Sequence, residues 1–147
     1  MKQYLLFEVA DNKYAIETTN VVKIISMKPI TSIPNTPHDI RGIINLEGRI
    51  IVVMDTRKRW HCDIKDDDLK TSIVITNFNE HWIGWIVDAV DKVMFFEERD
   101  LLPIVWGKIV QEIPLVKQVI CYEGELVGVI SEVGLMGGIG GKVYENT

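Results

Sequence analysis

The stretch "RGIINLEGRIIVVMDTRKRW", residues 41–60, decides how this chain folds. Two apolar runs, IRGIINL (40–46) and RIIVVMD (49–55), flank a Glu-Gly turn. Apolar runs on both sides of a tight glycine-containing turn are typical of a β-hairpin. A basic segment, TRKRW (56–60), follows and is compatible with a short helix. The pattern leaves open whether the charged turn only connects two strands or forms a surface that a partner recognises.

The rest of the chain repeats this pattern of short apolar or alternating runs separated by turn residues. About ten short strands with little helix are typical of all-β barrels or a sandwich. The glycine-rich stretch 137–147 is predicted to be a flexible tail. The other expected strands lie at 3–9, 14–17, 21–27, 71–77, 81–90, 92–102, 118–122 and 125–131, and loops are expected at 28–37 and 61–70.

An internal repeat organises these strands. YAIETTNVVKI (14–24) aligns with IGWIVDAVDKV (83–93), and LEGRIIVVMD (46–55) aligns with YEGELVGVIS (122–131). Chance similarity between two β-rich segments is the alternative explanation. A true duplication predicts two units, each with a hairpin, a middle strand and a second hairpin, and five strands can close into a small barrel. We therefore expect one domain over residues 1–136 with two interwoven five-stranded barrels, approximately 1–65 and 66–136.

Length and composition place the chain among single-domain soluble proteins. It has 147 residues, 47% hydrophobic and 25% charged, which suffices for a core without disulfide or metal support. A net charge of −5 disfavours nonspecific binding to nucleic acid or to anionic membranes. The two cysteines form no disulfide framework, and no segment has the length of a membrane-spanning helix. A cytoplasmic location follows as the expectation.

The sequence offers no set of residues for catalysis. The histidines, His38, His61 and His81, match no metal motif, and Asp66–Asp68 departs from the spacing of a calcium loop. No phosphate-binding glycine loop or nucleophile motif occurs. Cys121 lies in an apolar run and is expected to be a buried hydrophobe. We therefore expect no catalytic, metal or cofactor site, and a function based on contact with other proteins.

The succession of motifs resembles the CheW-like chemotaxis coupling-protein family. The matching residues are YLLFEV (4–9), YAIE (14–17), VVKII (21–25), ITSIPNTPHDIRGIINLEGRIIVVMDTRKRW (30–60) and TSIVITN…IGWIVDAVDKVM (71–94). The resemblance covers roughly residues 2–136. It implies two five-stranded SH3-like barrels that share a hydrophobic core, with few short helices, in agreement with the internal repeat.

The resemblance also implies a role and two partners. Proteins of this family are adaptors without catalysis, which join the regulatory domain of the histidine kinase CheA to the cytoplasmic tips of chemoreceptors in membrane-associated arrays. We expect this chain to be such an adaptor, soluble and without membrane insertion. The alternative is a CheW-like regulatory adaptor of another chemosensory pathway, such as a pilus-type system, with altered partner specificity.

Two charges in this chain depart from the family pattern. The family turn usually reads Asn-Leu-Arg-Gly with an arginine that faces the partner, whereas this chain has Glu47. An acidic residue is frequent two positions after Val21 in the family, whereas this chain has Lys23. We hypothesise that Lys23 and Glu47 form a swapped ion pair that sets partner choice, because charge placement governs specificity more than stability. Two unrelated changes are the alternative.

The family's contact positions transfer to eight residues of this chain. For Gly42 and Gly48 a turn or bulge requirement is the simpler explanation, and for Asn45 it is a hydrogen bond within a turn. The candidate partner-binding set is Val21, Lys23, Gly42, Asn45, Glu47, Gly48, Ser72 and Gly84.

Overall fold

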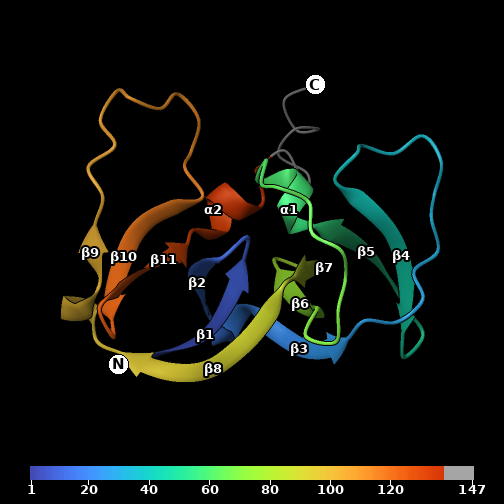
Figure 1. Cartoon of the computed structure of the whole chain (residues 1–147), viewed down its shortest axis with the longest axis horizontal. Coiled ribbons are helices and arrows are strands. Elements are labelled where there is room, and N and C mark those ends of the chain that lie inside the picture. The colour runs from blue at the N-terminus through green and yellow to red at the C-terminus, as the bar shows by residue number, and fades with distance from the viewer. Residues whose placement is uncertain (138–147) are drawn as a thin grey trace.

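The computed structural model describes residues 1–137, which form eleven strands and four short helical turns (Figure 1). No helix among these residues is long and apolar enough to cross a bilayer. The predicted tail lies outside the described residues, apart from Gly137. In chain order the elements are β1 (Lys2–Val9), β2 (Asn12–Glu17), η1 (Thr18–Asn20), β3 (Val21–Ser26), β4 (Ile40–Leu46), β5 (Arg49–Asp55), α1 (Thr56–Arg59), β6 (Ser72–Phe78), β7 (His81–Val87), β8 (Ala89–Phe96), η2 (Glu98–Asp100), β9 (Leu102–Pro103), β10 (Val116–Tyr122), β11 (Glu125–Ile130) and α2 (Glu132–Leu135).

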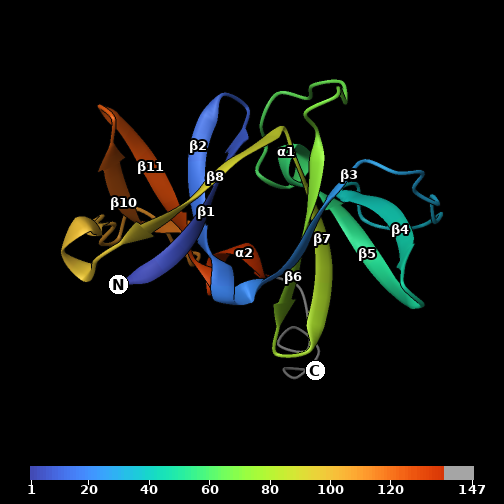
Figure 2. The same cartoon turned by 90° about the horizontal axis from the view of Figure 1, so that it is seen from below.

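The strands form two sheets that lie side by side (Figures 1 and 2). One is five-stranded in the order β3-β6-β7-β5-β4, and the other is six-stranded in the order β8-β1-β2-β11-β10-β9. The sixth strand, β9, has only two residues. An all-β fold in two subdomains with few short helices is thereby confirmed.

Strand register confirms the internal repeat. In the five-stranded sheet β5 pairs in parallel with β7, so that Val53 lies opposite Gly84. In the six-stranded sheet β11 pairs in parallel with β2, and Val129 lies opposite Ala15. These four residues are the positions that the two sequence alignments make equivalent. Chance similarity would not place aligned residues in the same register, so the repeat is structural.

The expected boundary near residue 65 separates the two repeats but not the two sheets. The hairpin β6–β7 of the second repeat joins β3, β4 and β5, while the hairpin β1–β2 of the first repeat joins β8, β10 and β11. The two hairpins are chemically alike, so a sequence comparison cannot show which repeat uses which hairpin. The short links η1 and Asp88 carry the chain directly from one sheet into the other.

Each sheet closes into a barrel through the segment that follows one of its edge strands, β3 in the five-stranded sheet and β8 in the six-stranded sheet. After β3, the backbone of Thr31 and that of Ile43 in β4 exchange two hydrogen bonds of 3.0 and 2.9 Å. After β8, the short strand β9 pairs with β10 in the same way. We call the five-stranded unit barrel 1 and the six-stranded unit barrel 2. Closure removes exposed sheet edges and brings the first and last strands of each unit together.

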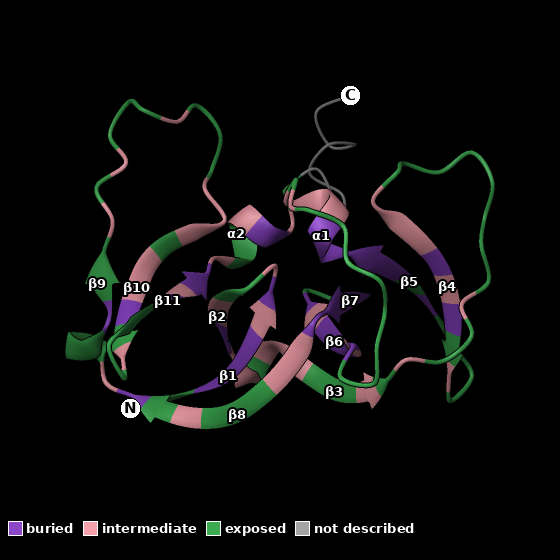
Figure 3. Cartoon of the chain, in the orientation of Figure 1, coloured by how far each residue is buried: buried purple, intermediate pink, exposed green. Residues whose placement is uncertain are grey.

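Three apolar clusters account for the packing. One fills barrel 1, with Ile51 and Ile73 at its centre, and a second fills barrel 2 around Leu6 and Ile120. The third lies between the barrels and combines Leu5, Phe7 and Ile130 of barrel 2 with Met54, Val74 and Trp85 of barrel 1. Figure 3 shows the buried residues concentrated on the strands that face this seam. The shared core expected from the resemblance is therefore present.

Cys121 corrects one expectation about the core. Its neighbour Ile120 is 1% exposed and points into barrel 2, so the next residue on the strand points outward. Cys121 is exposed, not buried. An apolar run in a barrel strand contains residues of both faces, which is why its hydrophobicity alone gave the wrong side.

Candidate partner-binding surface

The Glu-Gly turn and strand β3 meet at a charged contact. Lys23 Nζ lies 2.9 Å from Glu47 Oε1, and the two side chains are 47% and 78% exposed. The two residues come from opposite edges of the sheet and are brought together by closure of barrel 1. The hydrogen bond from Lys23 lowers the pKa of the Glu47 carboxyl. The predicted ion pair is confirmed as a contact, and its role in partner choice stays a prediction.

Barrel 2 carries a related arrangement at the equivalent place. Lys92 aligns with Lys23, and its Nζ lies 5.2 Å from the ring centroid of Tyr122, next to the second Glu-Gly turn. The contact with Tyr122 is the main cause that raises the pKa of Lys92, and Asp91 and Glu123 add to it. A lysine that meets the hairpin turn is thus a recurring feature of barrel closure in this chain: Lys23 contacts Glu47 in barrel 1, and the aligned Lys92 contacts Tyr122 in barrel 2.

The backbone of the first turn is held by its own residues. Glu47 and Gly48 both have positive φ, 52° and 90°, as a two-residue hairpin turn requires. The Gly48 N–H donates to Asn45 Oδ1 at 2.8 Å, and Lys28 Nζ donates to the Asn45 carbonyl oxygen at 3.0 Å. The turn-forming explanation for Asn45 and Gly48 is therefore confirmed, and the turn presents Glu47 to solvent.

Gly42 and Gly84 are fixed by packing. Gly42 has φ of 152°, and a Cβ there would overlap the carbonyl oxygen of Thr31, so this glycine permits the closure of barrel 1. Gly84 is buried, and a Cβ there would lie 2.9 Å from Ile73 Cγ2. Neither position offers a side chain to a partner, so any effect of these residues on binding acts through the shape of barrel 1.

Val21 and Ser72 lie apart from the charged turn. Val21 is half-buried against the seam cluster. Ser72 pairs with Ser26 at the far end of β3, and its hydroxyl donates to the Lys70 carbonyl oxygen at 3.0 Å. The structure thus brings Lys23, Asn45, Glu47 and Gly48 into one patch and leaves Val21, Ser72, Gly42 and Gly84 outside it. Whether any of the eight binds a partner stays a prediction.

Exposed apolar side chains on the outer faces of the barrels escaped the sequence interpretation. In barrel 1, Ile24 on β3 is 41% exposed and Ile50 on β5 is 61% exposed. The repeat makes Val93 on β8 and Leu126 on β11 their equivalents, and these are 45% and 66% exposed. The sequence could have indicated these exposed apolar residues. Only alternate residues of a strand face the barrel interior, yet the aligned outward-facing positions are apolar in both repeats.

The loop between β9 and β10 adds a second apolar feature on barrel 2. It projects from the body of the molecule (Figure 1), with Val105 and Ile109 87% and 80% exposed. Trp106 anchors it, because its Nε1 donates to the Val116 carbonyl oxygen at 2.9 Å. Exposed apolar groups gathered on one loop are typical of surfaces that contact another protein.

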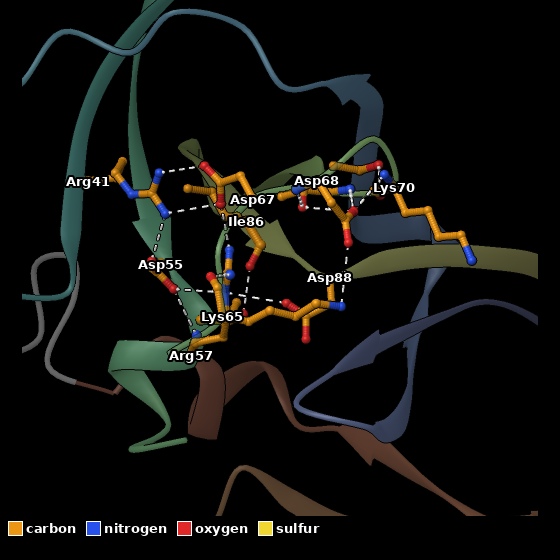
Figure 4. Close-up of polar contacts among 12 residues, drawn as sticks. Arg41, Asp55, Arg57, Lys65, Asp67, Asp68, Lys70, Ile86 and Asp88 are labelled. Atoms are coloured by element: carbon orange, nitrogen blue, oxygen red, sulfur yellow. Dashed lines mark hydrogen bonds and ion pairs between the residues drawn. The ribbon is translucent and has the colours of Figure 1, made fainter. Parts of the chain in front are cut away.

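The basic segment that follows the first hairpin is largely interior. Asp55 caps helix α1 by accepting the backbone N–H of Arg57, and the Arg57 side chain is fully buried. Its guanidinium meets Asp67 at 2.9 Å and Asp88 at 3.3 Å, while Arg41 contacts both Asp55 and Asp67 at 2.9 Å (Figure 4). A run of arginines that would pass for a basic surface patch in sequence is thus an internal charge network.

The comparisons with known proteins agree with this geometry. The CheW-like domain family model matches residues 3–138. The chain is 28% identical to Chemotaxis protein CheW of Bacillus subtilis over 129 residues, which is 88% of this chain and 83% of that protein. It is 28% identical to Chemotaxis protein CheW of Klebsiella aerogenes over 102 residues, or 69% of this chain and 61% of that protein. Some of these curated relatives are thus matched over less than two thirds of their own length.

A solved structure extends the similarity to three dimensions. The scaffolding protein TtCheW of Thermoanaerobacter tengcongensis superposes with a TM-score of 0.79 and 29% sequence identity, covering 88% of each chain. Fold and site define a two-barrel β protein with exposed apolar side chains on its outer faces. The chain belongs to the CheW-like domain family.

Proposed function

We propose that this protein is a non-enzymatic chemotaxis adaptor that couples the cytoplasmic tips of chemoreceptors to the regulatory domain of a CheA-type histidine kinase. The match of the CheW-like family model to residues 3–138 carries this proposal. The relatives are named as chemotaxis proteins and the structural neighbour as a scaffolding protein, which supports the same role. In this role the protein works in the cytoplasm and is recruited to membrane-associated receptor arrays.

The distribution of exposed apolar residues supports contact with two partners. Barrel 1 presents Ile24 and Ile50 beside the charged turn, and barrel 2 presents Val105 and Ile109 on a projecting loop. A single enclosed active site would be expected to gather polar groups in one cleft, whereas these features lie on separate outer faces. Separate faces allow a receptor and a kinase to bind at the same time, as an adaptor requires.

Binding measurements with purified partners test the proposal. The full chain is titrated with a receptor cytoplasmic fragment and with a CheA regulatory domain, each by isothermal calorimetry. We expect both to bind, with Ile24→Lys weakening one partner and Val105→Lys weakening the other. Val133→Lys, on helix α2 and 48% exposed, is the matched control and should bind both like the parent. Binding of neither partner would contradict the adaptor function.

The inverted charges favour a second candidate, an adaptor of another chemosensory pathway with altered partner specificity. Lys23 and Glu47 form a direct ion pair at the turn where the family usually carries an arginine. The test is the double reversal Lys23→Glu with Glu47→Arg, compared with each single change. We expect the double variant to lose binding to its native partners although its internal ion pair is restored. Binding equal to that of the parent would show that the pair does not set specificity.

A further inference from the structure

The loop between the two repeats forms one wall of an open groove. This loop, residues 61–71, is called the strap below. A groove of about 550 Å³ lies between the end of the strap at Leu69 and Lys70 and the hairpin β1–β2, which contributes Glu8 and Lys13. Ser72 and the start of β8, Ala89–Asp91, complete its lining. One wall therefore belongs to the connection that leaves barrel 1, and the other belongs to barrel 2.

The guanidinium of Arg57 reaches the strap directly. Its Nη2 donates to Asp67 Oδ1 at 2.9 Å, and its Nη1 donates to the carbonyl oxygen of Lys65. Arg41 binds the same carboxylate from the other side, with Nη1 at 2.9 Å from Asp67 Oδ2. Asp67 lies two residues before Leu69, so these contacts fix the strap next to the groove.

The same guanidinium reaches the opposite wall through Asp88. Arg57 Nε lies 3.3 Å from Asp88 Oδ1, and Asp88 Oδ2 accepts the backbone N–H of Ala10 at 2.7 Å. The Asp88 N–H in turn donates to the carbonyl oxygen of Glu8 at 2.9 Å. Ala10 lies in the turn between β1 and β2 with a positive φ of 51°, so this carboxylate holds the hairpin at its most constrained point.

The two connections differ in quality. The contact to Asp67 is a hydrogen-bonded ion pair, whereas Arg57 Nε and Asp88 Oδ1 are buried and make no hydrogen bond. Their separation of 3.3 Å leaves an electrostatic contact without good donor geometry. Arg57 therefore holds the strap more tightly than the hairpin, and loss of the Asp67 carboxylate would leave the carbonyl oxygen of Lys65 as the strap group bound to Arg57.

We propose that Arg57 sets the width of this groove by binding both of its walls, through Asp67 to the strap and through Asp88 to the β1–β2 hairpin. Arg57 touches no groove surface itself and acts as a positioning residue. With both contacts made, the strap and the hairpin keep one separation. When the contact to Asp67 is lost, Arg57 holds the strap only at the Lys65 carbonyl oxygen, so the end of the strap at Leu69 and Lys70 gains freedom and the groove samples wider states.

Distance measurement between spin labels on the two walls tests this inference. Labels are attached to Leu69→Cys and Asn12→Cys, both exposed positions, in the full chain with Cys62→Ser and Cys121→Ser. Pulsed electron–electron double resonance should give one narrow distribution of label-to-label distances in this parent. Asp67→Asn should broaden the distribution and add longer distances.

A neighbouring carboxylate provides the matched control. Asp66 is exposed, and its side chain makes no ion pair or hydrogen bond with the described residues, so Asp66→Asn should keep the narrow distribution. Should Asp67→Asn fail to fold, Arg57→Lys replaces it, because lysine keeps the buried positive charge but cannot contact both walls. A parent-like distribution in whichever of these two variants is measured would overturn the proposal, as would an equal broadening in Asp66→Asn.

Discussion

Replacement of Arg57 by methionine should be among the most destabilising single changes in this protein. Arg57 is 0% exposed, and Asp88 beside it is 6% exposed. Arg41 contacts Asp55 and Asp67 and remains in the variant. Within the described residues, the loss of Arg57 therefore leaves Asp88 as the carboxylate without a cation. Removing one member of a buried ion pair costs about 3–5 kcal/mol, because the remaining charge is uncompensated.

That loss is a large part of the stability of a domain of this size. Natural domains unfold with about 5–15 kcal/mol, and for a chain of about 150 residues each kcal/mol lowers Tm by about 2–4 °C. We therefore expect Tm to fall by about 6–20 °C, and the urea midpoint to fall with an unchanged slope. Arg99→Met is the control, because the Arg99 side chain is 83% exposed and its loss should change stability by no more than about 0.5 kcal/mol.

A second substitution distinguishes the effect of an uncompensated buried charge from the effect of a packing defect. Adding Asp88→Asn to Arg57→Met removes the uncompensated carboxylate while leaving an oxygen that can accept the Ala10 N–H. The double variant should recover part of the lost stability, measured as the coupling energy of a double-mutant cycle. A loss below about 1 kcal/mol in the single variant would refute the reasoning from buried charge. An absence of recovery in the double variant would refute it as well.

Three further predictions concern acid stability and the two packed glycines. Arg41, followed by Arg57, holds the pKa of Asp67 below its ordinary value of 3.8. The contribution of the Asp67 carboxylate to stability is therefore present above that value and is lost as the pH falls through the lower pKa of the folded state. Asp67→Asn should flatten the pH dependence of urea unfolding in that range. Gly84→Ala should destabilise the chain by about 1–3 kcal/mol through overpacking, while Ala15→Gly at the equivalent position should also destabilise it by about 1 kcal/mol, both measured by thermal unfolding; a stabilised Gly84→Ala would contradict the packing described. Gly42→Ala should weaken the closure of barrel 1, seen as faster amide exchange at Thr31 and Ile43, and unchanged exchange there would count against a steric need for glycine.

Local chemistry made much of the fold predictable. The hairpin at residues 40–55 follows from two apolar runs around a Glu-Gly pair, and both residues adopt the positive φ that such a turn needs. Equivalent residues in the two repeats share register in both sheets, because a duplicated sequence keeps the same side-chain alternation. The contact between Lys23 and Glu47 was also predictable, since family resemblance related two positions that lie far apart in sequence.

Other features depended on contacts that no local pattern encodes. The hairpins β1–β2 and β6–β7 are exchanged between the repeats, although either could pair with either set of strands by composition. Cys121 faces solvent because Ile120 occupies the interior. The eight candidate contact residues do not form one patch, because Gly42 and Gly84 are fixed inside the barrel wall.

Residues 41–60 contain both features that the local sequence determines and features that depend on the tertiary structure. The sequence by itself determined the hairpin, the turn and the short helix that follows it, because these depend on alternation and turn chemistry over a few residues. Only the tertiary structure decided that Glu47 is exposed and paired while Arg57 is fully buried beside carboxylates from two other segments, Asp67 and Asp88. The local sequence around a charged residue does not identify the residues that its side chain contacts. Those contacts are set by closure of the barrel and by the packing of the two barrels against each other.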